Sequence, residues 1–332
     1  MTVAIGIKAL NEEPNIAACL ESALAAVRPW GGHVVLADSG SSDRTVAIAR
    51  DYPDVRVVQL THPEQRCCGA GAQLAYQGAG EAEFFYLLDG DMTILPGFLD
   101  AGIGFLRAHP RHAGVGGKVI EVNVESIEFE ARARNDKAKQ KSHTGDVDRL
   151  DCGGLYRMSA LRELDYFTDR NLHAFEEFDL GIRLIARGWK LARIETPAIQ
   201  HRGHQDPALR LVWRRIRTGY AGGTGEVVRA AMAQRRLAPL LRGFSHLRHA
   251  TIVVIWWLTL ALVLLCGWWW WAAVLLGAPV GLLSLRRRSL RHGLYSLATW
   301  NMHGVGLLQG LGRGRVPPEA VLEMTVLRKG AP

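Results

Sequence analysis

This chain of 332 residues is predicted to form an α/β domain with a mostly parallel sheet and flanking helices, followed by C-terminal transmembrane or interfacial helices. Two observations predict this fold class. In the first 200 residues, apolar runs end abruptly in polar and acidic segments, as buried parallel strands do at their carboxyl ends. In the last third, residues 250–285 form a run of 36 residues without a charged side chain, which is longer than a globular core needs.

The first two strands are predicted over Thr2–Ile7 and His33–Ala37. The first strand leads into the loop Asn11-Glu12-Glu13, and the second leads into Asp38-Ser39-Gly40-Ser41-Ser42-Asp43. Ligands of open α/β sheets bind beyond the carboxyl ends of the strands. Both loops are therefore candidates for a ligand site at one edge of the sheet.

The most informative element is the aromatic run Phe84–Leu88, which ends in Asp89-Gly90-Asp91. The run predicts a buried parallel strand, and two carboxylates at its carboxyl end are placed to hold a hard cation against a phosphorylated substrate. An isolated Asp-x-Asp also occurs where a strand simply closes into a turn. The other acidic loops predicted at the same edge favour the ligand site.

Two later segments add polar groups to this edge. Gly153 and Gly154 offer a position where a ligand can approach the backbone closely. The segment Glu176-Glu177-Phe178-Asp179-Leu180 opens a predicted helix with a cluster of carboxylates. Four carboxylate-bearing elements in this order are hard to explain as four unrelated turns.

From Ile5 to about His204 the chain resembles the catalytic domain of the family 2 glycosyltransferases, an inverting family with the nucleotide-diphospho-sugar-binding fold called GT-A. The matching motifs are Asn11-Glu12-Glu13, Asp38 to Thr45, the helix region Arg66 to Gly80, Asp89-Gly90-Asp91, Cys152 to Arg157 and Glu176 to Leu180. The resemblance implies a nucleotide-diphospho-sugar donor and a sugar-transfer reaction. It does not identify the sugar.

The resemblance also implies which residues bind the donor. The predicted donor-binding residues are Asn11, Glu12, Asp38, Asp43, Arg66, Asp89, Gly153 and Gly154. Asp38 would contact the nucleobase, and Arg66 would border it. Glu12 and Asp43 would lie in the nucleotide pocket. Asp43 has an alternative interpretation as the N-cap of a helix over Arg44–Arg50.

A divalent cation, Mg²⁺ or Mn²⁺, is expected as the cofactor, because the departing diphosphate gains negative charge during transfer. Asp91, and less directly Asp89, would hold the cation against the diphosphate. His201 would complete the coordination, as a histidine does in many enzymes of this fold. His201 and His204 follow the last predicted strand, Lys190–Ile194, and its exit loop. The alternative for these two histidines, which are three residues apart, is a pair of surface residues.

The general base should be a carboxylate beside the acceptor hydroxyl. The resemblance implies Glu177, although the family usually has Asp at this second position, so Glu176 remains a competitor. A helix start is the alternative for the whole cluster, since acidic side chains in a first turn stabilise a helix through its dipole. The i, i+4 pair Asp179 and Arg183 is predicted to be structural.

Charge and hydropathy predict a membrane-associated C-terminal part. Residues 1–200 contain 22 Lys and Arg against 28 Asp and Glu, whereas residues 201–332 contain 18 against 4. The uncharged run 250–285 can hold two membrane-crossing helices with a break near Gly267, and the tryptophans Trp268–Trp271 after the break are typical of a membrane interface. The alternative is a buried core helix of a soluble protein.

Arginines flank this hairpin on both sides, with ten in residues 201–249 and six in residues 286–315. By the positive-inside rule both ends face the cytoplasm, so the catalytic domain is expected at the cytoplasmic face of the cell inner membrane. The same arginines would attract anionic lipid headgroups. Lipid is therefore favoured over nucleic acid as the polyanionic partner, and no nucleic-acid partner is expected.

Four segments are predicted along the chain. They are a GT-A catalytic domain (1–204), basic amphipathic interface helices (205–249), a transmembrane hairpin (250–285) and a basic C-terminal segment (286–332). A candidate third membrane or interface helix lies in the last segment, over Gly293–Gly312.

The predicted function is a membrane-anchored, metal-dependent, inverting glycosyltransferase of the hexosyltransferase type, active in polysaccharide or glycolipid synthesis. It would transfer a sugar from a nucleotide-diphospho-sugar to a lipid-linked or other saccharide acceptor. One alternative, a sugar-nucleotide pyrophosphorylase, would need a glycine-rich phosphate loop after the first strand, where Lys8-Ala9-Leu10-Asn11 stands. The other, a catalytically silent membrane scaffold, would not need the intact carboxylates.

Overall fold

The computed structural model describes residues 2–122, 144–151, 153–203 and 207–330, so Cys152 and His204 lie outside the described residues. The chain forms two compact units. Unit 1 comprises Met1–Val124, Arg132–His204 and Arg315–Pro332, and unit 2 comprises Glu125–Ala131 and Gln205–Gly314. Along the chain, most of unit 2 is therefore inserted before the last segment of unit 1.

Unit 1 is built around one sheet, in which the structure describes ten strands. They are β1 (Val3–Ala9), β2 (His33–Asp38), β3 (Val55–Leu60), β4 (Phe84–Asp89), β5 (Met92–Ile94), β6 (His112–Glu121), β7 (Gly145–Val147), β8 (Gly154–Arg157), β9 (Lys190–His201) and β10 (Met324–Arg328). Their spatial order is β10-β3-β2-β1-β4-β8-β6-β9-β5, with β7 paired to β9. The sheet is mixed, because β1 to β4 are parallel whereas β8 is antiparallel to β4 and β6.

The register at the centre of the sheet confirms that the predicted strands end at one edge. Lys8 on β1 pairs with Asp89 on β4, and the next residue, Ala9, pairs with Asp38 on β2. The glycine Gly154 on β8 pairs with Leu87 on β4. The acidic loops and the glycine pair therefore meet beyond the carboxyl ends of β1, β2 and β4.

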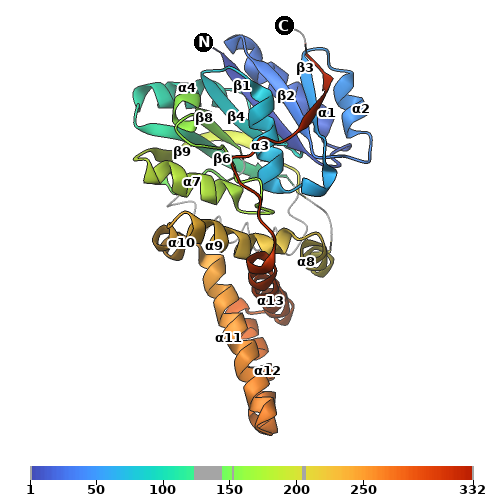
Figure 1. Ribbon diagram of the computed structural model, residues 1–332, viewed down its shortest axis with the longest axis vertical. Helices are drawn as coiled ribbons and strands as arrows, with labels where there is room; N and C mark the ends of the chain where they lie inside the picture. The colour runs from blue at the N-terminus through green and yellow to red at the C-terminus, as the bar shows by residue number, and fades with distance from the viewer. Residues whose placement is uncertain (1, 123–143, 152, 204–206, 331–332) are drawn as a thin grey trace. The chain divides into compact units, whose positions relative to one another are not determined.

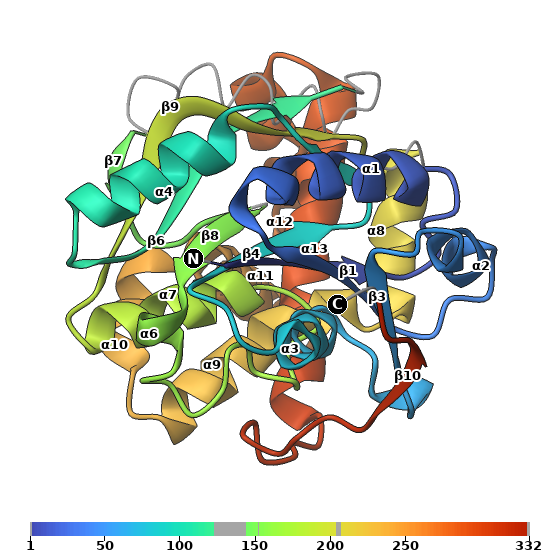
Figure 2. The same cartoon turned by 90° about the horizontal axis from the view of Figure 1, so that it is seen from above.

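Helices cover both faces of this sheet (Figure 2). The helices α1 (Ile16–Val27) and α4 (Phe98–Ala108) lie on one face, and α3 (Cys68–Ala79), α6 (Met158–Leu161) and α7 (Glu176–Ala186) lie on the other. The short helix α2 (Thr45–Arg50) packs with the α1 face through Ala49. The 3₁₀ turns η1 (Arg28–Trp30) and η2 (Pro63–Gln65) join neighbouring elements.

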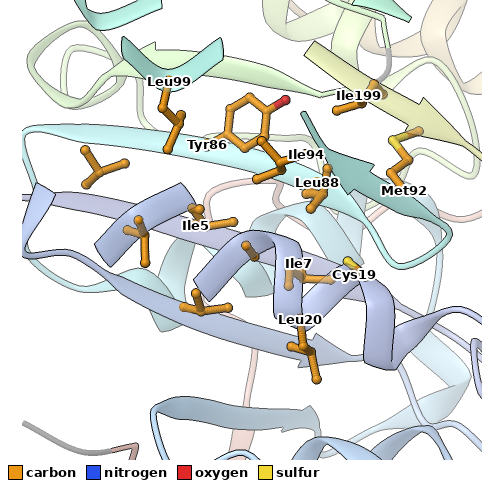
Figure 3. Close-up of a cluster of buried hydrophobic side chains, with 14 of the residues drawn as sticks. Ile5, Ile7, Cys19, Leu20, Tyr86, Leu88, Met92, Ile94, Leu99 and Ile199 are labelled. Carbon is orange, nitrogen blue, oxygen red and sulfur yellow. The ribbon is translucent and has the colours of Figure 1, made fainter. Parts of the chain in front are cut away.

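Strand alternation divides the apolar core between these two faces. Ile5 and Ile7 of β1 point toward α1 and pack with Tyr86 and Leu88 of β4, as Figure 3 shows. The residue between Tyr86 and Leu88 on β4, Leu87, points to the opposite face and packs with the α3 side, as does Phe85. Lys8 is four residues after Ala4 on β1, so the two side chains point to the same face of the sheet. Ala4 packs on the α3 side, and the side chain of Lys8 therefore points toward α3 and α7.

Two strands differ from the sequence-based prediction. The last strand was expected over Lys190–Ile194, but β9 continues to His201, with irregular register against β6. His201 therefore lies on a strand and not after an exit loop. The strand β10, which sequence analysis did not anticipate, pairs antiparallel with the edge strand β3. The final residues of the chain thus complete the sheet of unit 1.

Unit 2 is helical in the residues that the structure describes. Its elements are α8 (Ala208–Arg217), η3 (Tyr220–Gly222), α9 (Gly223–Ala233), α10 (Leu237–Gly243), α11 (Ser245–Leu265), α12 (Trp269–Arg287) and α13 (Leu290–Gly312). The helices α11 and α12 lie side by side (Figure 1), and Trp256 Nε1 donates to Leu275 O at 2.9 Å. The predicted break falls at Gly267, whose φ of +72° favours glycine.

Two features of unit 2 match a membrane environment. The helices α11 and α12 are long and apolar enough to cross a bilayer. In addition, α13 packs closely against η3 through Gly306 and Gly310, because a Cβ at either position would come within 2.0 Å of a carbonyl oxygen of Ala221 or Gly222. This Gly-x-x-x-Gly spacing is typical of helices that pack closely in membranes.

Candidate active site

The candidate site lies in unit 1, where β1, β2 and β4 end. It receives Lys8 and Asp89 from neighbouring positions of β1 and β4, and Glu176 from the first turn of α7. Asp91 follows β4 directly, and His201 ends β9. Residues that are more than 100 positions apart in the sequence are thus brought together at one edge of the sheet.

A buried lysine stands at the centre of this edge. Lys8 Nζ lies 2.7 Å from Glu176 Oε1 and 3.1 Å from Asp89 Oδ1, and the side chain is only 15% exposed. Burial alone would lower the pKa of Lys8, but the carboxylates of Asp89 and Glu176 outweigh it and raise this pKa well above its usual value. Sequence analysis missed Lys8, although a lysine inside an apolar strand was a visible signal.

The helix α7 begins with the two candidate bases. Phe175 precedes it in the left-handed region, with φ of +67°, and the chain turns there into the helix. Glu176 is buried against Lys8. Burial raises the pKa of Glu177 well above its usual value, and Lys8 acts in the opposite sense. The two adjacent glutamates therefore have different surroundings.

The predicted structural pair behind them is confirmed. Arg183 Nε lies 2.8 Å from Asp179 Oδ2, with both side chains buried. Arg183 Nη1 also donates to Tyr166 O, and Nη2 donates to Phe167 O. This ion pair fixes the first turns of α7 to the loop that leads into them.

His201 lies between two carboxylates. Its Nε2 is 3.3 Å from Asp91 Oδ2, and its Nδ1 is 2.7 Å from Glu121 Oε2. The histidine is only 8% exposed, so the interpretation of His201 as a surface residue is wrong. Burial alone would lower the pKa of His201, but the hydrogen bonds to Asp91 and Glu121 raise it to about 10. Sequence analysis missed Glu121, because nothing in its strand marks it as close to β9.

The carboxylate of Asp91 fits a divalent cation. Its Oδ1 atom is buried and has no hydrogen-bond partner among the described residues, so one oxygen remains to bind a ligand. Within the described part of the chain, no group of three or more His, Cys, Asp or Glu side chains is arranged as a metal site. His201 would have to lose its Nε2 proton to act as a ligand.

In Asp38, as in Asp91, hydrogen bonds are made by one carboxylate oxygen only. Its Oδ2 accepts hydrogen bonds from Gly40 N, Ser41 N and Gln59 Nε2, at 2.7 to 2.9 Å. Its Oδ1 is buried and has no partner within the described residues. Two loop amides and a side chain therefore hold the carboxylate in place and leave one acceptor atom for a ligand.

The loop that carries Asn11 and Glu12 is tied to the loop after β2. Asn11 adopts φ of +57°, and its Oδ1 accepts from Ser42 N at 2.8 Å. Glu12 N donates to Thr45 Oγ1 at 2.8 Å. Burial raises the pKa of Glu12 to about 7, so this carboxyl is partly protonated at neutral pH.

The side chain of Asp43 caps the start of α2. Its Oδ1 accepts from both the backbone N and the hydroxyl of Thr45, the first residue of α2, and its Oδ2 accepts from Glu13 N. Burial acts in the opposite sense, but these hydrogen bonds lower the pKa of Asp43. The geometry matches the helix-cap interpretation, and Asp43 also links the two donor-side loops.

The remaining predicted donor residues lie at the borders of the site. Arg66 follows η2 and is exposed just before α3. Gly153 has φ of +81°, and a Cβ there would lie 3.1 Å from Tyr86 Oη. Gly154, the next residue, pairs beside the end of β4. The glycine pair is thus required by backbone conformation and by close packing, and it lies close to Asp89.

Comparisons with known proteins agree with this architecture. Residues 4–165 match the family model described as "Glycosyl transferase family 2". None of the curated proteins matches the chain in sequence.

Solved structures show the same fold at low sequence identity. The mannosyltransferase PcManGT from Pyrobaculum calidifontis, in complex with GDP-Man and Mn²⁺, is 17% identical with a TM-score of 0.60, over 93% of this chain and 85% of that one. S. aureus TarS 1–349 in complex with UDP-GlcNAc is 17% identical with a TM-score of 0.51, over 74% of this chain and 76% of that one. Another structure of TarS 1–349 is 18% identical with a TM-score of 0.50, and the match spans 68% of this chain and 65% of that one.

Proposed function

Because residues 4–165 belong to glycosyl transferase family 2, we propose that this protein is an inverting glycosyltransferase that transfers a sugar from a nucleotide-diphospho-sugar to a lipid-linked or saccharide acceptor. The observation that carries the proposal is the set of carboxylates at one edge of the sheet. Asp91 offers there a buried oxygen that has no hydrogen-bond partner among the described residues, and Glu176 and Glu177 approach the same edge from α7. A cation-binding acid and a candidate base are both needed for this reaction.

On the donor side, Asp38 Oδ1 would accept a hydrogen bond from the nucleobase, since this oxygen has no partner within the described part of the chain while Oδ2 is held by its own loop. Glu12 and Asn11 would border the nucleotide, and Arg66 would lie at the base. Asp91 would hold Mg²⁺ or Mn²⁺, with Asp89 and His201 nearby. When bound, such a cation neutralises the charge that develops on the departing diphosphate.

On the acceptor side, Glu177 would act as the general base. The acceptor oxygen attacks the anomeric carbon, the bond from that carbon to the diphosphate breaks, and the hydroxyl proton passes to the Glu177 carboxylate. A base held in a poorly solvated place has a raised pKa, which makes it a stronger proton acceptor in the transition state. The raised pKa of Glu177 supports this assignment.

We also propose that the protein is anchored at the cytoplasmic face of the inner membrane through α11 and α12. Their length and composition support the anchor, and the arginines on both sides of the hairpin support the orientation. The domain limits expected from the sequence belong to the same proposal, with the addition that residues 315–332 return to unit 1. A membrane-bound enzyme of this kind would meet a lipid-linked acceptor at the surface of the bilayer.

The experiment uses the purified full chain in detergent with a panel of nucleotide sugars that includes UDP-GlcNAc and GDP-Man. A membrane extract supplies acceptors, and release of nucleoside diphosphate is measured with Mn²⁺ and with a chelator. The proposal expects release with at least one donor, only with metal, together with a glycosylated product. A pyrophosphorylase would instead form nucleoside triphosphate from a nucleotide sugar and pyrophosphate, and a silent scaffold would release nothing.

A further inference from the structure

Lys8 occupies the position between the cation-binding side and the base side of the proposed site. Its ammonium group joins Asp89 Oδ1 at 3.1 Å with Glu176 Oε1 at 2.7 Å. Asp89 is the first carboxylate of the Asp-x-Asp motif, and Glu176 directly precedes the proposed base Glu177. One side chain thus links the two halves of the reaction through direct ion pairs.

The surrounding structure confines this lysine. Lys8 lies on β1, the central parallel strand, with β2 on one side and β4 on the other. The helix α3 covers its stem, since a Cβ added to Gly71 would lie 3.5 Å from Lys8 Cβ. Glu176 is only 7% exposed in its side chain, so the ion pair with Lys8 is largely shielded from water. A shielded ion pair of this kind holds its partners in place more firmly than a surface pair.

The two adjacent glutamates consequently differ. One oxygen of Glu176 is bound to the ammonium group, and this side chain is held toward the sheet. Glu177, the next residue of the same helical turn, points in another direction around the helix because successive residues are separated by about 100°. The ion pair therefore holds Glu176 in place and leaves Glu177 as the carboxylate that can act as the base.

We propose that Lys8 is a positioning residue for sugar transfer, which tethers Glu176 to Asp89 and so keeps Glu177 as the carboxylate that reaches the acceptor. The inference rests on the proposed function. It differs from that proposal in assigning a role to a residue that touches neither donor nor acceptor. Lys8 acts through Glu176, and the start of α7 keeps its orientation relative to the Asp-x-Asp motif.

The test is a double-mutant cycle in the full chain. Lys8→Met is measured in the wild-type background and in the Glu176→Gln background, with whichever of UDP-GlcNAc and GDP-Man the wild-type protein turns over faster. We expect Lys8→Met to lower kcat by about 10²-fold in the wild-type background, the size expected when a catalytic group is misplaced by about 1 Å. The KM for the donor should change much less than kcat, because Lys8 reaches the donor side only through Asp89. Lys8→Arg, which keeps the charge, should recover part of the loss.

The cycle distinguishes a positioning role from a general structural one. If Lys8 acts through Glu176, Lys8→Met should have a much smaller effect in the Glu176→Gln background, because coupled residues do not contribute additively. An equal loss in both backgrounds, a loss confined to KM, or near-normal kcat in Lys8→Met would overturn the inference. If Lys8→Met folds poorly, the same cycle is measured with Lys8→Arg, which keeps the charge and changes only the geometry of the ion pair.

Lys190, the first residue of β9, offers a matched control for Lys8 because it is also a lysine that pairs with a carboxylate. Lys190 Nζ also pairs with a carboxylate, Asp146 Oδ2 at 2.6 Å, but both side chains are about half exposed. Lys190→Met should leave kcat and KM unchanged. If the wild-type protein turns over no donor, the proposed function itself is overturned. If the wild-type protein is active and Lys8→Met has the same kcat, only the role of Lys8 is overturned.

Discussion

Units 1 and 2 use the same types of apolar side chain in opposite ways. In unit 1, Phe84, Phe85 and Tyr86 of β4 are fully buried. In unit 2, Leu258 of α11 is 67% exposed, and Trp270 at the start of α12 is 86% exposed. Exposed apolar surface on this scale marks an interaction site with a partner or a membrane. The comparison teaches that unit 1 buries its apolar side chains in its own core, whereas α11 and α12 of unit 2 leave many of theirs exposed, as helices long and apolar enough to cross a membrane do.

The charged groups show the reverse contrast. Unit 1 buries Lys8, Glu176 and Arg183 in ion pairs, and such groups are retained inside a protein only when they are paired. In α8 of unit 2, by contrast, Arg214 and Arg217 lie exposed beside the exposed Trp213. The contrast holds for the site and for α8, although unit 2 also buries one carboxylate, Glu226, which pairs with Arg313.

The largest expected effect comes from the core of unit 1. Phe85→Ala should destabilise the protein by about 3–5 kcal/mol, because it leaves a cavity under α3. The matched variant Leu258→Ala in unit 2 should change stability by less than about 0.5 kcal/mol, because that side chain faces outward. Thermal unfolding of both variants in detergent measures the difference. Equal destabilisation would mean that α11 is packed as a core helix and would break the comparison between the units.

The next effect concerns the cation-binding carboxylate. Asp91→Asn should lower turnover by about 10²- to 10³-fold and leave the chain folded, since the stabilisation lost is the several kcal/mol that a cation supplies to a departing phosphate. The matched control is Asp146→Asn, an exposed carboxylate that also pairs with a histidine, His112, at 3.0 Å. It should leave turnover unchanged. Loss of folding in Asp91→Asn would assign that residue to structure.

A comparable or smaller effect is expected for the base. Glu177→Gln should lower transfer by about 10²-fold or more, within the range for loss of a general base, with little change in the affinity for UDP or GDP in the presence of Mn²⁺. Glu176→Gln should have less effect, because Glu176 is tethered to Lys8. Transfer rates and nucleotide binding of both variants are compared. A larger loss in Glu176→Gln would exchange the roles of the two residues, and near-normal transfer in both would leave the cluster as a helix start.

The same base sets the direction of the pH dependence. Because burial raises the pKa of Glu177, the deprotonated base is lost as pH falls through this raised value. Transfer should therefore decline on the acid side at a pH above the range of an ordinary glutamate. The profile of kcat against pH measures this, and an acid limb in the ordinary range would show that the base is well solvated.

The smallest effect per residue is expected from the arginines of unit 2. A variant that lacks residues 245–289 but keeps residues 315–332 should be only partly released from anionic vesicles at low salt, because nine arginines remain in residues 201–244. Each contributes roughly 1 kcal/mol near such a surface. Binding of this variant should disappear at high salt, which screens the attraction. A fully soluble variant at low salt would contradict the electrostatic contact.

Most of the elements around the site could be predicted from the sequence, because each apolar run ended in a distinct polar motif. The strands β1, β2 and β4, the start of α7 and the break at Gly267 all carried such local signals. What could not be predicted depended on pairing between distant segments. Lys8 gains its role only beside Glu176, and Glu121 gains its role only beside His201. The contacts of both pairs are set by sheet register and helix docking, which leave no mark in the local sequence.

The strand β10 affects how the chain is synthesised. Its Thr325 faces Thr61, 264 residues earlier, at the end of β3. While the ribosome is still making unit 2, β3 has no neighbour on its outer side, and an open strand edge is prone to pair with other chains. The strand β10 can pair with β3 only after α11 and α12 have been synthesised, because it follows them in the chain. A chain that stalls within those helices therefore leaves β3 open to pairing with other chains, whereas in the folded protein β10 pairs with β3 and becomes the outer strand itself.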